Sequence, residues 1–235
     1  MVEVIAFDGD DTLWHSEAGF VEVQEAFHQL CAPYIDPADR AGIDAELYRT
    51  EAANMATFGY GVKAFTLSMV ETAVRVSDGA IPASEIAAIV EAGKDLLNRP
   101  VELCDGAAEA VDELAADHRL LLLTKGDLLH QERKIADSKL ADHFDRVQIV
   151  SEKDAGTYRR VMQEEELGSG QLLMVGNSLR SDILPALEAG AHAVHVPYQY
   201  TWVHEQVSTN GREDIVVLDS LKALPEHVQE LRRTP

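Results

Sequence analysis

The chain has 235 residues, and 46% of them are apolar, which is enough for one large domain or for a core with an inserted subdomain. It carries 41 acidic and 20 basic residues, and the formal net charge is −21. A charge of this sign and size repels nucleic acids and anionic membrane surfaces, so the composition argues against both as partners.

Neither the cysteines nor the apolar segments indicate secretion or membrane insertion. Cys31 and Cys104 belong to no metal-binding or redox spacing and are expected to be buried thiols in a reducing compartment. No segment has the roughly 20 apolar residues of a membrane span, and the first residues do not follow the pattern of a signal peptide. We therefore expect a cytoplasmic protein.

Short apolar runs alternate with helix-like stretches along much of the chain. This alternation predicts an α/β fold with a parallel sheet and helical crossovers. The expected strands are residues 3–7, 119–123, 146–150, 171–175, 192–196 and 215–218. From residue 119 onward the spacing of these strands fits one strand and one helix per repeat.

The long interval between the first two expected strands contains helices instead. Glycines and prolines divide it into amphipathic segments. These segments are residues 16–31, 38–58, 62–77 and 83–98. We expect an inserted helical cap over 15–98, while 1–14 and 99–235 form the α/β core.

Two aspartates at the end of the first strand are the most informative residues. Asp8 and Asp10 follow a short apolar run, and two carboxylates placed so close together repel each other unless one is protonated or both face a cation. Asp8 could attack an electrophile or bind a metal, and Asp10 could transfer a proton. The alternative is a turn in which Asp10 or Asp11 caps the next helix, but capping accounts for a single aspartate.

The second and third loops offer groups suited to a phosphate. Thr124, Lys125 and Gly126 follow the second strand, where a hydroxyl and free backbone amides can hold phosphate oxygens, although such a turn is also common without a ligand. Lys153 follows the third strand and could neutralise a phosphate, or it could be a solvated lysine. Lys134 competes for this role but lies inside a predicted helix.

The fourth loop supplies candidate metal ligands. Asp182 could bind Mg²⁺ through its carboxylate, and Asn177 could contribute its carbonyl oxygen directly or hold a metal-bound water. The alternative is that Ser181 or Asp182 caps a helix over 182–189. Because ligands bind at the carboxyl ends of parallel strands, the four loops together predict one site at one edge of the sheet.

These motifs resemble those of the haloacid dehalogenase-like hydrolase superfamily, in particular its phosphatases with a helical cap. The first motif of that family is matched by residues 7–13, Phe-Asp-Gly-Asp-Asp-Thr-Leu. Thr124 and Lys153 match the second and third, and residues 176–182, Gly-Asn-Ser-Leu-Arg-Ser-Asp, match the fourth. Asn177 departs from the family pattern, which often has an acidic residue there. The resemblance implies a Rossmann-like three-layer sandwich.

The resemblance also implies a mechanism and a cofactor. Asp8 would form an aspartyl-phosphate, and Asp10 would act as the acid and then as the base. Thr124, Lys153 and the amides near Lys125 and Gly126 would bind the phosphate. Mg²⁺ would lie on Asp8, the backbone carbonyl of Asp10, Asp182 and Asn177.

The substrate is less well defined by the sequence. Asp10 favours phosphate esters over haloacids, since the dehalogenases of the family lack an acid at this position. In the expected cap, Tyr60 and Lys63 are candidates for substrate specificity, with packing and solvation as the alternatives. We expect hydrolysis of a small phosphorylated metabolite, a sugar phosphate or a nucleoside monophosphate, by a monomer or homodimer. The competing functions are a phosphomutase, a 2-haloacid dehalogenase and a non-catalytic protein that binds phosphometabolites.

Overall fold

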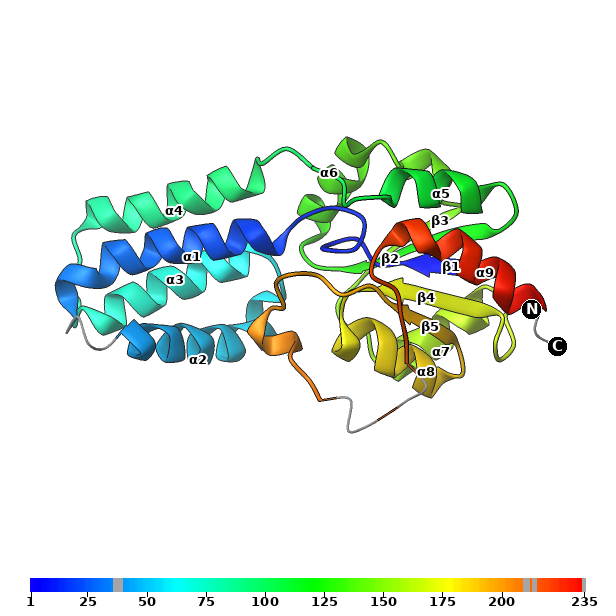
Figure 1. Ribbon diagram of the computed structural model, residues 1–235. Helices are drawn as coiled ribbons and strands as arrows, with labels where there is room; N and C mark the ends of the chain where they lie inside the picture. Colours follow the sequence, from blue (N-terminus) through cyan, green and yellow to red (C-terminus); the bar gives the residue numbers. More distant parts are fainter. Residues whose placement is uncertain (36–39, 209–211, 213–214, 234–235) are drawn as a thin grey trace. The chain divides into compact units, whose positions relative to one another are not determined.

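The structure, a computed structural model, describes residues 1–35, 40–208, 212 and 215–233 (Figure 1). The chain divides into two compact units. The first, which we call the core unit, comprises Met1–Glu17, Val101–Lys125 and Gln131–Pro235. The second, the helical unit, comprises Ala18–Pro100 and Gly126–His130. The predicted insertion, 15–98, did not include the short segment Gly126–His130.

A six-stranded parallel sheet forms the centre of the core unit. Its strands are β1 (Val4–Phe7), β2 (Arg119–Lys125), β3 (Arg146–Val150), β4 (Leu172–Gly176), β5 (His192–His195) and β6 (Val216–Val217). They lie in the order β3-β2-β1-β4-β5-β6, and every neighbouring pair is parallel. Phe7 of β1 pairs with Leu122 on one side and with Val175 on the other. The predicted parallel α/β sheet is confirmed.

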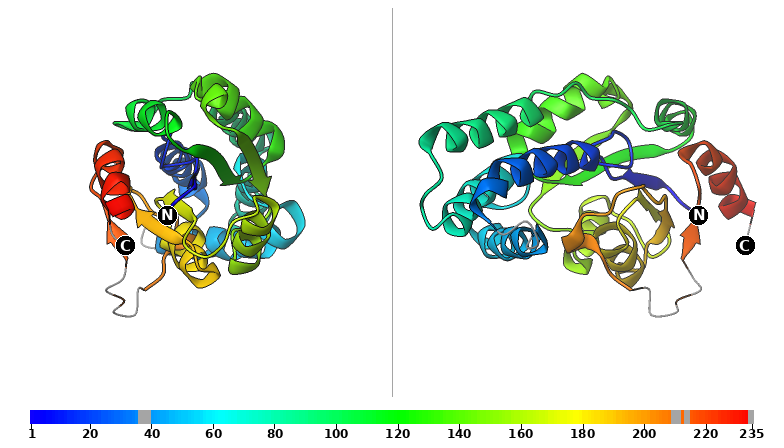
Figure 2. Two further views of the ribbon diagram at one scale, coloured as in Figure 1. Left: turned by 90° about the vertical axis from the view of Figure 1, so that its right-hand side faces the viewer. Right: turned by 60° about the vertical axis from the view of Figure 1, so that its left-hand side comes forward.

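Helices cover both faces of this sheet, as the left view of Figure 2 shows. Alternate residues of a strand face opposite sides, so Ile5 and Phe7 belong to one apolar cluster and Val4 and Ala6 to another. The first cluster also contains side chains of α5 (Ala107–Ala115), α6 (Leu128–Ser138) and α9 (Leu224–Arg233). The second contains those of α7 (Ala155–Glu164) and α8 (Leu184–Ala189). The predicted three-layer, Rossmann-like architecture is therefore present.

The strand order places β1 at a switch point. From β1 the chain winds outward through β2 and β3, and it then returns to the other side of β1 with β4. In open α/β sheets, ligands bind beyond the carboxyl ends of the strands at such a point. The loops that follow β1, β2 and β4 are therefore the expected place for a ligand in the core unit.

The helical unit has its own apolar centre. Its helices are α1 (Glu17–Cys31, which begins in the core unit), α2 (Arg40–Phe58), α3 (Val62–Val76) and α4 (Ala83–Leu97). Phe27, Leu47, Met69 and Ile89, one from each helix, are buried in the same cluster. The sequence predicted the second helix from residue 38, but residues 38 and 39 lie outside the described part of the chain.

Two expectations from composition can be compared with this fold. In the part of the chain that the structure describes, no helix combines the length and the apolar character needed to cross a bilayer. Cys31 is a buried free thiol, and Cys104 is a half-buried one.

Candidate active site

Three buried charged side chains meet at the carboxyl edge of the sheet. Lys153 Nζ lies 2.5 Å from Asp8 Oδ1 and 2.7 Å from Asp182 Oδ1, and the lysine side chain is only 2% exposed. Burial raises the pKa of Asp8 to about 7, although the charge of Lys153 acts in the opposite direction. Burial alone would lower the pKa of Lys153, but the charges of Asp182 and Asp8 raise it above its ordinary value. A charged lysine thus bridges the two carboxylates.

A short π-helical turn, Leu179–Ile183, places Asp182 beside this lysine. Ser178 begins the turn: its side chain accepts a hydrogen bond from the Ser181 N–H, and its own N–H donates to Asp182 Oδ2 at 2.9 Å. Gly176 makes room for the carboxylate, because a Cβ there would lie 2.3 Å from Asp182 Oδ2. The alternative interpretation of this loop was a cap at Ser181 or Asp182, but the capping residue is Ser178.

Asn177 brings an amide oxygen to the same place. Thr12 Oγ1 lies 3.4 Å from both Asp8 Oδ2 and Asn177 Oδ1, so these two oxygens flank one hydroxyl. The backbone carbonyl of Asn177 lies 2.9 Å from His195 Nε2, at the end of β5. Thr12 therefore links the loop of the first motif to the loop of the fourth.

This set of donors fits a hard divalent cation. Mg²⁺ prefers oxygen ligands and commonly uses one or two carboxylates while it keeps several waters. Asp8 and Asp182 offer carboxylate oxygens, and Asn177 offers an uncharged one. Among the described residues no group of three or more His, Cys, Asp or Glu side chains is arranged to hold a metal. A metal at this site would therefore rely on the two carboxylates, on the amide or backbone oxygens and on water.

Asp10 is held by three donors. Its Oδ1 accepts from Trp14 Nε1 at 2.6 Å and from Lys134 Nζ at 2.5 Å, and its Oδ2 accepts from Gln131 Nε2 at 3.1 Å. Burial would raise the pKa of Asp10, but the charge of Lys134 and the three hydrogen bonds lower it below its ordinary value. The sequence treated Lys134 and Lys153 as competitors for one role, whereas the structure uses both: Lys153 contacts Asp8, and Lys134 contacts Asp10.

The predicted phosphate loop is tied to two neighbouring elements. The buried hydroxyl of Thr124 accepts from Gln131 Nε2 at 2.9 Å. Lys125 Nζ donates to Glu205 and, at 2.9 Å, to Ser181 Oγ. The Glu205 carboxylate also accepts from the hydroxyls of Ser178 and Ser181. Glu205 thus links the loop after β2 to the turn that carries Asp182.

The structure places the remaining candidates in the helical unit. Lys63 Nζ lies 2.9 Å from both carboxylate oxygens of Asp127, and Asp127 Oδ1 accepts the backbone N–H of His130 in the first turn of α6. Tyr60 is half-buried near the start of α3, and Gly126 belongs to the same unit by its contacts. The specificity role of Tyr60 and Lys63 stays a prediction.

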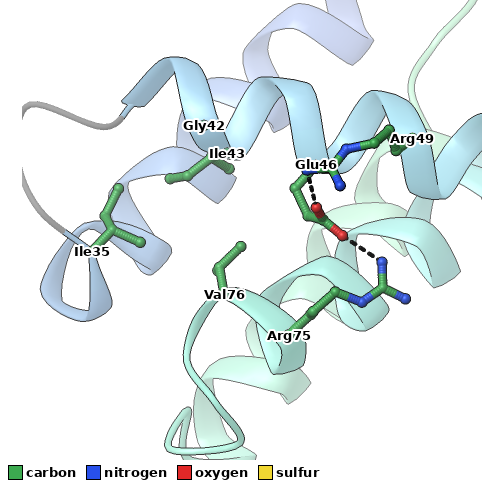
Figure 3. Close-up of a pocket in the computed structure, with 7 residues that line it drawn as sticks. All are labelled: Ile35, Gly42, Ile43, Glu46, Arg49, Arg75 and Val76. Atoms are coloured by element: carbon green, nitrogen blue, oxygen red, sulfur yellow. Dashed lines mark hydrogen bonds and ion pairs between the residues drawn. The ribbon is translucent and has the colours of Figure 1, made fainter.

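The helical unit also has a surface pocket of about 320 Å³ that contains none of the predicted site residues (Figure 3). Glu46 lies between Arg49 and Arg75 and pairs with both. Ile35, Ile43 and Val76 contribute its apolar wall. Because both guanidinium groups have a carboxylate partner, the pocket has no strong preference for an anion.

Sequence reasoning missed Trp14, Gln131 and Glu205 as parts of this site, and it named Lys134 only as a competitor of Lys153. Gln131 and Lys134 are three residues apart in α6, a spacing that puts them on one helix face, and both are buried. A polar pair on an otherwise amphipathic helix is a weak signal. Glu205 ends a short 3₁₀ helix, Val203–Glu205, after β5 and carried no sequence signal.

Comparison with known proteins identifies the family. The model of the haloacid dehalogenase-like hydrolase family matches residues 2–190 of this chain. The chain belongs to the haloacid dehalogenase-like hydrolase family. The predicted resemblance is thus confirmed, and with it the class of enzyme, a hydrolase.

Solved structures agree with this assignment. A haloacid dehalogenase-like family hydrolase from Xanthomonas campestris is 39% identical, with a TM-score of 0.87, over 98% of this chain and 91% of that one. A HAD-hydrolase from Bacillus subtilis bound to magnesium is 16% identical, with a TM-score of 0.66, over 97% and 98% of the two chains. An L-2-haloacid dehalogenase from Xanthobacter autotrophicus has 16% identity and a TM-score of 0.63 over 97% and 99%. The last two show the shared fold alone. No curated protein matches the sequence.

Proposed function

We propose that this hydrolase cleaves phosphomonoesters of small metabolites, such as a sugar phosphate or a nucleoside monophosphate, with Mg²⁺ as its cofactor. The observation that carries the proposal is the pairing of a buried carboxylate, Asp8, with a second carboxyl group two residues later. Gln131 links that second group, Asp10, to the hydroxyl of Thr124. The groups that would serve as nucleophile, proton-transfer group and phosphate ligand thus lie at one edge of the sheet.

In the first step, an oxygen of Asp8 attacks phosphorus and the bond from phosphorus to the ester oxygen breaks. The products are an aspartyl-phosphate and an alcohol, whose proton comes from Asp10. In the second step, Asp10 takes a proton from a water molecule that attacks phosphorus. The bond from phosphorus to Asp8 breaks, so the carboxylate is regenerated and inorganic phosphate is released.

Asp10 has to gain a proton before the first step. Lys134, Trp14 and Gln131 favour its ionised form in the free enzyme. A bound phosphoryl group brings negative charge next to Asp10, and a like charge nearby raises the pKa of a carboxyl group. Substrate binding thus works towards the protonated form, and product departure restores the carboxylate.

The positive charges of the site would stabilise the phosphoryl group in transit. Lys153 lies on Asp8 Oδ1, so its ammonium group would also lie near the equatorial phosphate oxygens. The hydroxyl of Thr124 and the backbone amides near Lys125 and Gly126 would donate to the same oxygens. Mg²⁺ held by Asp8, Asp182, Asn177 and the Asp10 carbonyl would supply the charge that offsets repulsion between the carboxylates and the phosphate.

One observation favours a second candidate, a 2-haloacid dehalogenase. Although burial opposes this, the charge of Lys134 and three accepted hydrogen bonds lower the pKa of Asp10 and favour its ionised form, and a halide leaving group needs no proton. Asp8 would then attack carbon and form an ester that water hydrolyses. We prefer the phosphatase, because an attack on carbon leaves Asp10 without a role in the first step.

The test is phosphate release from a broad panel of phosphomonoesters, with Mg²⁺ and with chelator, for the wild type, Asp8→Asn and Asp105→Asn. Asp105 is an exposed carboxylate of the core unit, its side chain 81% exposed, and serves as the matched control. We expect Mg²⁺-dependent turnover that Asp8→Asn abolishes and Asp105→Asn leaves intact. Chloride release from 2-chloropropionate without metal would instead establish the dehalogenase.

The same panel separates the phosphatase from a phosphomutase and from a binding protein. An isomer as product, with dependence on a bisphosphate activator, would identify a phosphomutase. Tight binding of phosphometabolites without any turnover would identify a binding protein. The cytoplasmic location, the monomeric or homodimeric state and the lack of nucleic-acid and membrane partners stay predictions.

A further inference from the structure

The α6 residues next to Asp10 have a geometry suited to fixing one carboxyl group. Lys134 and Gln131 bind different oxygens of Asp10, at 2.5 and 3.1 Å. Trp14 Nε1 adds a third bond at 2.6 Å, from the segment that follows the first motif. Because the donors come from two directions and reach both oxygens, they fix the orientation of the carboxyl plane as well as its position.

Gln131 also connects this carboxyl group to the phosphate loop. Its Nε2 donates to the Thr124 hydroxyl and to the carbonyl of Lys125, both at 2.9 Å, in addition to Asp10. Its Oε1 is buried and has no hydrogen-bond partner among the described residues. A buried acceptor without a partner is unfavourable, and the side chain adopts this arrangement because three acceptors surround its amide nitrogen.

Lys134 is a buried lysine whose charge is paired with Asp10. Its side chain is 10% exposed, and a buried ammonium group requires a charged partner, which here is Asp10. The neighbouring Arg133 is exposed to solvent on the same helix. The two basic residues therefore have different roles, although they are adjacent in sequence.

We propose that Lys134 and Gln131 are positioning residues, which hold Asp10 where it delivers its proton to the leaving oxygen of the substrate. This inference rests on the proposed phosphatase function, and it assigns the control of leaving-group chemistry to one face of α6. The consequence is a dependence on the leaving group. Departure of an alkoxide needs the proton, whereas departure of p-nitrophenolate, a weak base, hardly does.

The experiment compares an alkyl phosphate from the panel with p-nitrophenyl phosphate for the wild type, Lys134→Met, Gln131→Met and the control Arg133→Met. General acid catalysis typically contributes about 10²- to 10⁴-fold. We expect the pre-steady-state rate of alcohol release, which reports the first step alone, to fall about 100-fold for the alkyl ester in Lys134→Met and no more than about threefold for p-nitrophenyl phosphate. Hydrolysis of the aspartyl-phosphate, where Asp10 acts as the base, is common to both esters and should slow equally for the two. KM for both esters should change little, since the phosphate ligands are intact, and Arg133→Met should behave like the wild type.

Each outcome is decisive. Equal losses in the rate of alcohol release on both esters in Lys134→Met would reduce its role to structural support and overturn the inference. If that variant does not fold, which thermal unfolding would show, the same comparison with the uncharged exchange Gln131→Met decides. Hydrolysis of neither ester by the wild type would refute the proposed function itself, a result distinct from equal losses.

Discussion

Replacing Lys153 with methionine should destabilise the core unit strongly. The change leaves Asp8 and Asp182 buried without their shared cation, and the side chain of Asp182 is only 1% exposed. Removal of one partner from a buried ion pair typically costs about 3–5 kcal/mol, because the remaining charge stays desolvated. For a chain of this length, each kcal/mol lowers Tm by about 2–4 °C, so a decrease of roughly 6–20 °C is expected.

The stability lost in Lys153→Met should increase with pH. Burial already raises the pKa of Asp8 to about 7 with Lys153 present, and loss of the lysine raises it further. A carboxyl group with a raised pKa binds its proton more tightly in the folded state, so the free energy of unfolding falls as pH increases towards that pKa. The cost of Lys153→Met should therefore be smaller at pH 5 than at pH 8.

Urea unfolding followed by tryptophan fluorescence measures the stability of the core unit, in which Lys153 lies. Both tryptophans of the chain, Trp14 and Trp202, belong to the core unit. Lys222→Met is the matched control, because Lys222 pairs with Asp105 at 2.7 Å on the surface of the same unit. An exposed pair contributes about 0–1 kcal/mol. A second substitution, Asp8→Asn, should recover part of the stability that Lys153→Met loses.

A loss below about 1 kcal/mol in Lys153→Met, equal to that of the control, would refute this reasoning. It would mean that water or relaxation compensates the two carboxylates, and that Lys153 does not bridge them. A loss that is independent of pH would likewise contradict the assignment of the cost to buried carboxylates.

Three further predictions concern the loops around the site. Burial would raise the pKa of Glu205, but Lys125 and the neighbouring hydroxyls lower it below its ordinary value. The ionised carboxylate therefore stabilises the folded state, and the wild type should lose this contribution as pH falls below about 4.3. Glu205→Gln should be less stable at pH 7 and show a weaker acid dependence in urea titrations. Gly176→Ala places a methyl group against Asp182; overpacking typically costs about 1–3 kcal/mol, and kcat for p-nitrophenyl phosphate should fall. Mg²⁺ should raise Tm of the wild type but not of Asp182→Asn, since a ligand stabilises the state that binds it.

The sequence predicted the sheet and four of its loops well. Apolar runs such as Leu120–Leu123 are buried on both faces in a parallel strand, and this pattern differs from that of the amphipathic helices between them. The carboxyl ends of parallel strands meet at one edge, so Asp8, Lys153 and Asp182 could be expected together from their places in the chain. Their contacts confirm that proximity, while their chemical roles stay predictions.

The partners of Asp10 could not be predicted in the same way. Gln131 and Lys134 lie within a helix that has both buried and exposed polar residues, and helical periodicity does not tell which polar residue meets a loop distant in sequence. Glu205 lies more than 20 residues from Ser178 and Ser181, and its bonds to them depend on how the segment after β5 returns to the site. Tertiary packing, not local pattern, decides such contacts.

The start of the fourth loop shows a different limit. Ser178, Ser181 and Asp182 are all good capping residues, so the sequence could not tell which begins the turn. The choice depends on the space beside Gly176, which lets Asp182 approach the backbone N–H of Ser178. The identity of the capping residue therefore depends on the close approach of Asp182 to Gly176 and Ser178, and not on the capping preferences of the residue types.

A single-turnover reaction in water enriched in heavy oxygen tests the central claim, that Asp8 attacks phosphorus, most directly. The enzyme is used in excess over a phosphomonoester with Mg²⁺, and both the released phosphate and the peptide that contains Asp8 are analysed by mass spectrometry. In a reaction quenched early, the Asp8 peptide should carry one phosphoryl group, which direct attack of water on the ester would not give. Water that attacks this aspartyl-phosphate at phosphorus leaves its oxygen in the phosphate, so the label should appear there and not in Asp8. Label in the Asp8 carboxylate, obtained with a 2-haloacid in place of the phosphate ester, would show hydrolysis of a carbon ester at its carbonyl group and would contradict the account.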